Sequence, residues 1–118
     1  FFGAASQTMR RILVDHARGR QRAKRGGGDV PVSLDAVEQY LTERESEELV
    51  LLDDALERLK ALNPRAALIV ERRFFGGLSL EEVADSLGLS RKTAQRDWNA
   101  ARAWLRKEIA TDLGLLEP

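Results

Sequence analysis

The sequence contains no cysteine and a single histidine, His16. Disulfide bonds are therefore excluded, and so are the Cys and His clusters that bind structural or catalytic metal ions. No apolar run approaches the length of a membrane-spanning helix, and no secretory signal pattern is visible. We therefore expect no metal site, no membrane association and a location in the reducing cytoplasm.

Proline and alternating β-branched residues are also scarce, whereas Ala, Leu, Glu and Arg are abundant. This composition predicts an all-α protein. Catalytic groupings are missing as well, because no nucleophile has a recognisable base and orienting partner. The glycines at 26–28 lack the preceding strand and the following lysine-serine pair of a phosphate-binding loop. We expect a protein that is not an enzyme and that needs no cofactor.

The formal net charge of +0 conceals a strong polarisation along the chain. Residues 1–28 contain seven basic residues and one acidic residue, and residues 29–60 contain three basic and ten acidic residues. Residues 61–118 are nearly balanced, but their cations gather in one segment after Ser90. Clustered positive charge is typical of a surface that binds nucleic acid.

The chain divides into a basic arm, a linker and one compact helical domain. Residues 1–25 form the predicted basic amphipathic helix, with Phe2, Ala5, Met9, Ile12, Leu13 and His16 on one face. Residues 26–44 are predicted to be a linker that holds a short helix from Ser33 to Tyr40. Residues 45–113 are predicted to form the domain, and residues 114–118 a tail.

Four helices are expected in this domain, beginning near Glu45, Pro64, Leu80 and Arg91. The third opens with a capping box of Ser79 and Glu82, and Gly88 ends it. The spacing of apolar residues predicts a core of Ile69, Val70, Phe74, Leu80, Val83, Leu87, Ala94, Trp98 and Leu105.

Residues 78–105 have the spacing of a helix-turn-helix, whose second helix opens at the N-cap Ser90. Its apolar residues Ala94, Trp98, Ala101 and Leu105 share one face, while polar donors share another. Arg, Lys, Gln and Asn bind base edges and phosphates in the major groove, and this motif delivers them from the first turns of its second helix. The alternative is an ordinary helical hairpin with a solvated basic face. The predicted DNA-binding residues are Ser90, Arg91, Lys92, Thr93, Gln95, Arg96 and Asn99.

Three neighbouring charged residues have other expected roles. We expect Arg102 and Arg106 to contact phosphate or solvent. Asp97 either orients Arg96 or Arg102 or pairs with a cation, and the second alternative is favoured.

Residues 47–108 resemble region 4 of bacterial RNA polymerase sigma factors of the extracytoplasmic-function (ECF) class. The segment FFGAASQTMRRILVDHARGRQRAKRGGG resembles the final helix of region 2 in the same family. The phrases RRILVDHARGR, RFFGGLS and RDWNAARAWL are most similar to a subgroup sometimes linked with serine/threonine kinase signalling.

This resemblance implies that residues 79–107 bind the −35 element of promoter DNA and that the domain contacts the RNA polymerase core. An anti-sigma factor or a serine/threonine kinase is implied as a controlling partner. Because only the last helix of region 2 is present, we expect that this chain alone does not initiate transcription. We also expect the apolar face of the first helix to pack on region 4 or on a second copy, which would give a homodimer through that helix.

Two further functional classes compete with this interpretation. A stand-alone helix-turn-helix regulator would bind a palindromic site as a dimer, whereas a sigma factor reads one asymmetric element. A helical protein-interaction module would show no salt-dependent DNA binding.

Overall fold

The computed structural model describes residues 2–26 and 43–115, and all the regular structure in these ranges is α-helical. The helices are α1 (Phe2–Gly26), α3 (Glu43–Leu62), α4 (Pro64–Phe74), α5 (Leu80–Leu87) and α6 (Arg91–Asp112). This confirms the predicted all-α class and the four helices of the compact domain. The predicted short helix from Ser33 to Tyr40, and most of the predicted linker, lie outside the described residues.

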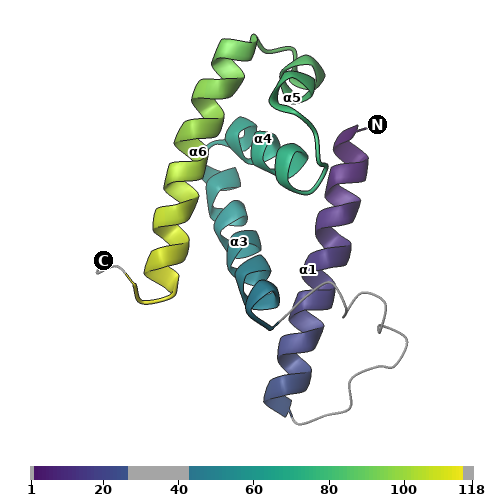
Figure 1. Ribbon diagram of the computed structural model, residues 1–118, viewed down its shortest axis with the longest axis vertical. Helices are drawn as coiled ribbons and strands as arrows, with labels where there is room; N and C mark the ends of the chain where they lie inside the picture. Colours follow the sequence, from purple (N-terminus) through teal and green to yellow (C-terminus); the bar gives the residue numbers. More distant parts are fainter. Residues whose placement is uncertain (1, 27–42, 116–118) are drawn as a thin grey trace.

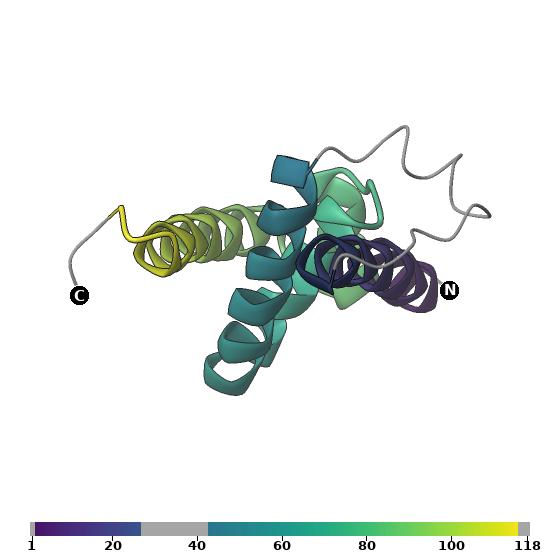
Figure 2. The same ribbon diagram turned by 90° about the horizontal axis from the view of Figure 1, so that it is seen from below.

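The central helices α3 and α4 lie between α1 on one side and α6 on the other (Figure 1). The view from below shows the same order, with α3 between α6 and α1 (Figure 2). Helix α5 packs on α6 and α4 near the beginning of α6. The first turns of α6 are therefore held at one end of the molecule, away from the start of α3.

Local sequence signals set the helix ends. Asn63 caps α4 by accepting a hydrogen bond from the backbone N–H of Ala66 at 3.2 Å, and Pro64 occupies the first turn. Ser79 and Glu82 form the predicted capping box, with hydrogen bonds of 3.1 Å and 2.9 Å. Gly88 adopts φ of 67°, a left-handed conformation that ends α5 with little strain for glycine.

The main core joins α1, α3, α4 and α6 around Leu56, which is fully buried. A smaller cluster around Ile69 and Val83 joins α4, α5 and Trp98 of α6, and another around Ala84 and Ala94 joins α5 to α6. Trp98 packs against all three clusters and is only partly buried. The indole therefore connects the helix-turn-helix to the rest of the domain.

The predicted core is largely correct, but Phe74 was assigned to it wrongly. Phe74 is 55% exposed, while its neighbour Phe75 is 6% exposed. Phe75 continues the row of buried residues Ala67 and Glu71 at four-residue spacing and joins the cluster that contains Val14 of α1. The sequence prediction missed this row because it did not anticipate that α1 covers this side of α4.

The buried face of α1 also differs from the predicted apolar face. The predicted residues Met9 and Ile12 are 44% and 51% exposed, whereas Ser6, Val14 and Ala17 are buried. Small residues on this face allow a close approach to the rest of the domain. A Cβ atom at Gly76 would collide with the Ser6 hydroxyl, so glycine is required where α1 meets the loop after α4. His16, which belongs to the predicted apolar face, lies in the packed interior.

Candidate nucleic-acid interface

The first turn of α6 is capped by a hydroxyl pair. Ser90 accepts a hydrogen bond from the backbone N–H of Thr93 at 3.1 Å, and its hydroxyl donates one to Oγ1 of Thr93 at 2.9 Å. The remaining N–H groups at this end still point along the helix axis, and the helix dipole adds a partial positive charge there. This end of α6 therefore favours an anionic group.

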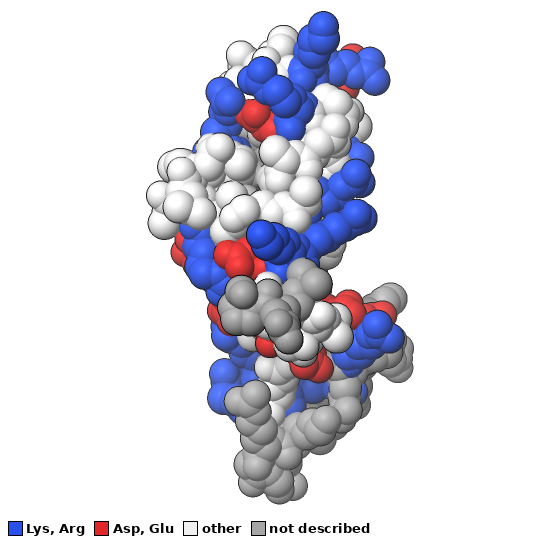
Figure 3. Space-filling model, turned by 90° about the vertical axis from the view of Figure 1, so that its left-hand side faces the viewer, with Lys and Arg blue, Asp and Glu red and all other residues white. Residues whose placement is uncertain are grey.

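Polar side chains cover the outer side of this half of α6. Arg91, Lys92, Gln95, Arg96 and Asn99 are exposed, together with the cap residue Ser90, and Thr93 is half-buried. Lys and Arg side chains gather at the end of the molecule where α6 begins (Figure 3). The seven predicted residues thus come together on one surface of a single helix.

Few of these donors are committed to other groups. Within the described ranges, Arg91 and Lys92 form no ion pair, and Arg96 has only a 3.9 Å contact with Asp97. Nε2 of Gln95 donates to Oδ1 of Asn99 at 3.0 Å, which aligns two amides one turn apart. The surface therefore has free hydrogen-bonding capacity, and Asp97 is the one carboxylate of the described residues that lies within 4 Å of its cations.

The opposite side of α6 is anchored in the domain. Ala94, Ala101 and Leu105 are buried, as their spacing predicts. The guanidinium of Arg73 in α4 lies 4.9 Å from the centre of the Trp98 ring, and that of Arg102 lies 5.9 Å from it. Both contacts are within the range of cation–π attraction. Trp98 is partly buried and also packs against the three core clusters, so it anchors α6 to the rest of the domain.

Asp97 pairs across the helices with Arg65 at the start of α4. Nη2 of Arg65 lies 2.7 Å from Oδ2 of Asp97, whose side chain is 12% exposed. This confirms the favoured expectation that Asp97 pairs with a cation. The sequence analysis missed Arg65 and Arg73, because their partners lie far along the chain and no local spacing connects them.

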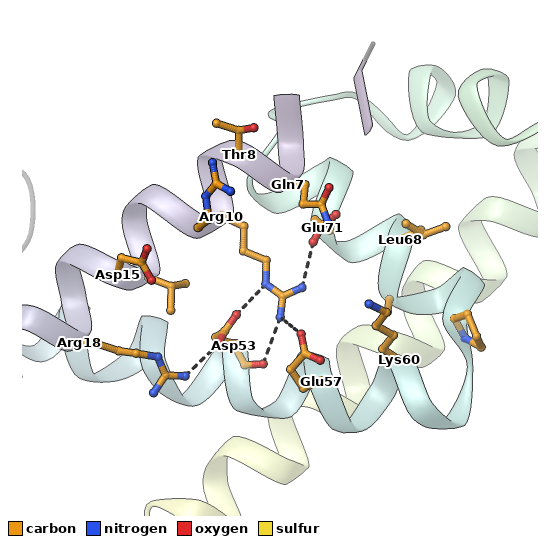
Figure 4. A pocket seen from close by; sticks show the side chains of 14 residues that line it. Gln7, Thr8, Arg10, Asp15, Arg18, Asp53, Glu57, Lys60, Leu68 and Glu71 are labelled. Carbon is orange, nitrogen blue, oxygen red and sulfur yellow. Dashed lines mark hydrogen bonds and ion pairs between the residues drawn. The ribbon is translucent and has the colours of Figure 1, made fainter. Parts of the chain in front are cut away.

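A second charged cluster joins α1 to α3 and α4 beside a pocket of about 550 Å³ (Figure 4). Arg10 contacts Asp53 at 2.7 Å, Glu71 at 2.9 Å and Glu57 at 3.0 Å. Burial lowers the pKa of Arg10, but hydrogen bonds to Glu71 and Asp53 and the charges of both outweigh it, so the pKa lies above its ordinary value. Arg10 is therefore a permanent cation that binds three carboxylates.

Arg18 continues this charged contact along α1. Its Nη2 atom lies 3.0 Å from Oδ2 of Asp53 and 2.8 Å from Oδ1 of Asp54. Hydrogen bonds to Asp54 and Asp53 raise the pKa of Arg18. Arg18, in the predicted basic arm, therefore faces the acidic side of α3 and pairs with carboxylates there.

Other kinds of site find no support in the part of the chain that the structure describes. No group of three or more His, Cys, Asp or Glu side chains there could hold a metal ion. No helix among residues 2–26 and 43–115 is long and apolar enough to cross a membrane. The α6 surface is the strongest candidate for function.

Comparison with known families supports the same assignment. The family model described as "ECF sigma factor" matches residues 1–111, which is nearly the whole chain. No curated protein and no solved structure matches the sequence. The match includes α1 as well as the helix-turn-helix, so it covers both parts for which the sequence shows a resemblance. The chain therefore belongs to the family of ECF sigma factors, DNA-binding regulators rather than enzymes, and its role is that of a sigma factor in transcription initiation.

Proposed function

We propose that this chain reads the −35 element of a promoter by placing the first half of α6 in the major groove, while the same domain contacts RNA polymerase. The observation that carries this proposal is the set of exposed, uncommitted donors on one side of a helix that is anchored on its other side. A helical hairpin whose basic face is only solvated needs neither a firmly packed second helix nor a cluster of free donors on that helix.

The side chains match the chemistry of base recognition. Arg91, Lys92 and Arg96 can donate to guanine, and Gln95 can bind adenine through two hydrogen bonds. Ser90 and Thr93 lie at the helix start, where hydroxyl and backbone N–H groups bind phosphate. Asn99 is one turn further from the helix start and acts through Gln95, with which it shares a hydrogen bond.

Cations that follow the first half of α6 along the helix supply affinity without sequence preference. Arg102 and Arg106 are exposed one and two turns after Trp98. At this distance from the helix start they reach phosphate oxygens more readily than base edges. We assign them to phosphate contacts that position α6 along the groove.

Selection of DNA by this chain tests the proposal. A pool of randomised duplexes should yield one asymmetric motif rather than a palindrome, because the family reads a single element. Arg91→Ala and Arg96→Ala should each weaken binding to that motif by about 5- to 150-fold, since one base contact discriminates by about 1–3 kcal/mol. Each variant should also lower the slope of log affinity against log salt by about one.

Arg44→Ala is the matched control. Arg44 is also an exposed arginine, with a side chain 88% exposed, but it lies at the start of α3, far from the start of α6 (Figure 1). Its removal changes the net charge equally and should leave the selected motif and its affinity unchanged. Equal losses for Arg44→Ala and Arg91→Ala would show a nonspecific charge effect and would refute base reading by α6.

The control of this activity is a separate proposal. The similarity to a kinase-linked subgroup supports an anti-sigma factor or a serine/threonine kinase as the regulator. A cytoplasmic location follows from the proposed binding to promoter DNA.

The homodimer through α1 stays a prediction, supported by the exposed side chains of Met9 and Ile12. Light scattering of the chain at high concentration tests it, and a monomer mass would refute it.

A further inference from the structure

The carboxylate of Asp97 lies between two exposed arginines, Arg65 and Arg96. Its Oδ2 atom is 2.7 Å from Nη2 of Arg65, and its Oδ1 atom is 3.9 Å from Nε of Arg96. The Asp97 side chain is 12% exposed, whereas that of Arg96 is 75% exposed. A carboxylate with so little access to water requires a cationic partner. Two guanidinium groups are within reach, and Arg65 makes the close contact.

The place of Arg65 in α4 is otherwise unfavourable. It is the second residue of this helix, where the dipole favours negative charge, and the first turn of α4 contains no acidic residue. Its pairing with Asp97 crosses from α4 to α6 and offsets this cost. The role of Arg65 therefore lies in its contact with α6 and not in the stability of its own helix.

Asp97 and DNA compete for Arg96, because a guanidinium turned toward Asp97 points away from the groove and is partly neutralised. Without Arg65, the nearest guanidinium to Asp97 among the described residues belongs to Arg96. Rotation of the exposed Arg96 side chain would be enough to turn the 3.9 Å contact into a hydrogen bond. Arg96 would then leave the reading surface, and its charge would be neutralised before any phosphate or base approached.

We propose that Arg65 is a positioning residue for promoter recognition: by occupying Asp97, it keeps Arg96 free to bind DNA. The DNA part of this inference rests on the proposed function of α6. The exchange of partners at Asp97 does not, because it takes place within the free protein.

The exchange is measured first, without DNA. The Nε–Hε signals of the arginines are recorded by NMR for the full chain, for Arg65→Met and for Arg65→Met with Asp97→Asn. In Arg65→Met, the Arg96 signal should shift to a hydrogen-bonded position and become ordered. The second substitution removes the charge of Asp97 and should return the signal to its original position. An Arg96 signal that is identical in the wild type and in Arg65→Met would overturn the proposal.

Binding to the selected duplex is measured next. Arg65→Met should weaken it by about 3- to 10-fold, in the lower part of the range expected for coupled neighbouring residues, and Asp97→Asn should restore it to within about twofold. Arg65→Lys keeps a cation near Asp97 and should retain most of the affinity. If Arg65 touched DNA itself, Asp97→Asn would not restore binding, and this result would also overturn the proposal.

Arg58→Met is the matched control for loss of an interhelical ion pair. Arg58 links α3 to the far end of α6 through Asp112 at 2.9 Å and Glu108 at 3.8 Å. Its removal should change neither the Arg96 signal nor the affinity for DNA. If the wild-type chain selects no duplex although the Arg96 signal responds as expected, the proposed function fails and the DNA part of the inference fails with it, while the exchange of partners stands.

Discussion

Removal of the Arg10 side chain should destabilise the docking of α1 more than any other single charge change in that helix. In Arg10→Met, the apolar stem is kept and the guanidinium is lost. Glu71, whose side chain is 11% exposed, then has no ion-pair partner among the described residues. Asp53 keeps Arg18 at 3.0 Å, and Glu57 is 61% exposed and stays solvated. The cost therefore comes mainly from Glu71.

The expected loss of stability follows from the different surroundings of these three carboxylates. Loss of one partner of a buried ion pair costs about 3–5 kcal/mol. We expect the lower value, about 3 kcal/mol, because only Glu71 loses its partner and its side chain is still 11% exposed. With a urea dependence of roughly 1–3 kcal/mol per molar, the unfolding midpoint should fall by about 1–3 M. Hydrogen exchange should show that the amides of α1 lose protection before those of α6, because α1 contacts only α3 and α4 strongly.

Arg11→Met is the control for this prediction. Arg11 is the exposed neighbour with no ion pair in the described part of the chain, so its substitution should change the free energy of unfolding by less than about 0.5 kcal/mol. Glu71→Gln added to Arg10→Met should restore about 1–2 kcal/mol, since it removes the unpaired charge. Equal effects of Arg10→Met and Arg11→Met would refute the reasoning, as would a failure of Glu71→Gln to restore stability.

Three further predictions concern the turns and caps. Gly76→Ala should destabilise by about 1–3 kcal/mol in urea unfolding, because its Cβ would meet Ser6 and the Arg72 carbonyl oxygen. Gly19→Ala lies within α1, where the new Cβ would make only an ordinary contact with the Arg22 side chain at 3.7 Å, and should stabilise by about 0.5–1 kcal/mol. Effects of the same sign in the two variants would contradict the packing. The backbone N–H and the side chain of Ser79 form hydrogen bonds with Glu82, which lower the pKa of Glu82 below its ordinary 4.5. The capping box therefore adds its stabilisation above pH 4.5, and this stabilisation is lost as the pH falls through the lowered pKa. Glu82→Gln should remove this pH dependence of thermal unfolding, and an unchanged profile would count against the capping box. Ser90→Ala should cost about 1 kcal/mol of stability as a lost N-cap and should weaken DNA binding, and a fully stable variant would show that the cap is dispensable.

The helix-turn-helix was predictable because its signals are local. The capping box at Ser79, the left-handed glycine at 88 and the N-cap at Ser90 each act within one turn of the chain. The alternation of packed and exposed residues along α6 also follows from helical periodicity alone. The exposed side of α6 could therefore be predicted residue by residue, and its binding to DNA stays a proposal.

The placement of α1 could not be predicted from such signals. Apolar periodicity favoured a face with Met9 and Ile12, which are exposed in the structure. Leu13 and His16 of that face do pack inward, but Ser6 and Arg10, which periodicity did not select, lie on the covered side as well. The choice of side depends on carboxylates at positions 53 and 71 and on the small residue Gly76, all distant in sequence. The burial of Phe75 instead of Phe74 has the same origin, because it depends on which side of α4 is covered.

The measurement that tests the central claim most directly is an NMR titration of the chain with the duplex enriched from the random pool. If α6 reads the DNA, the largest backbone shifts will fall between Ser90 and Asn99, and the Gln95 and Arg96 side-chain signals will change with single base-pair substitutions in the duplex. Shifts confined to the basic residues of α1, unchanged by the base sequence, would contradict the claim and would assign DNA binding to the arm instead.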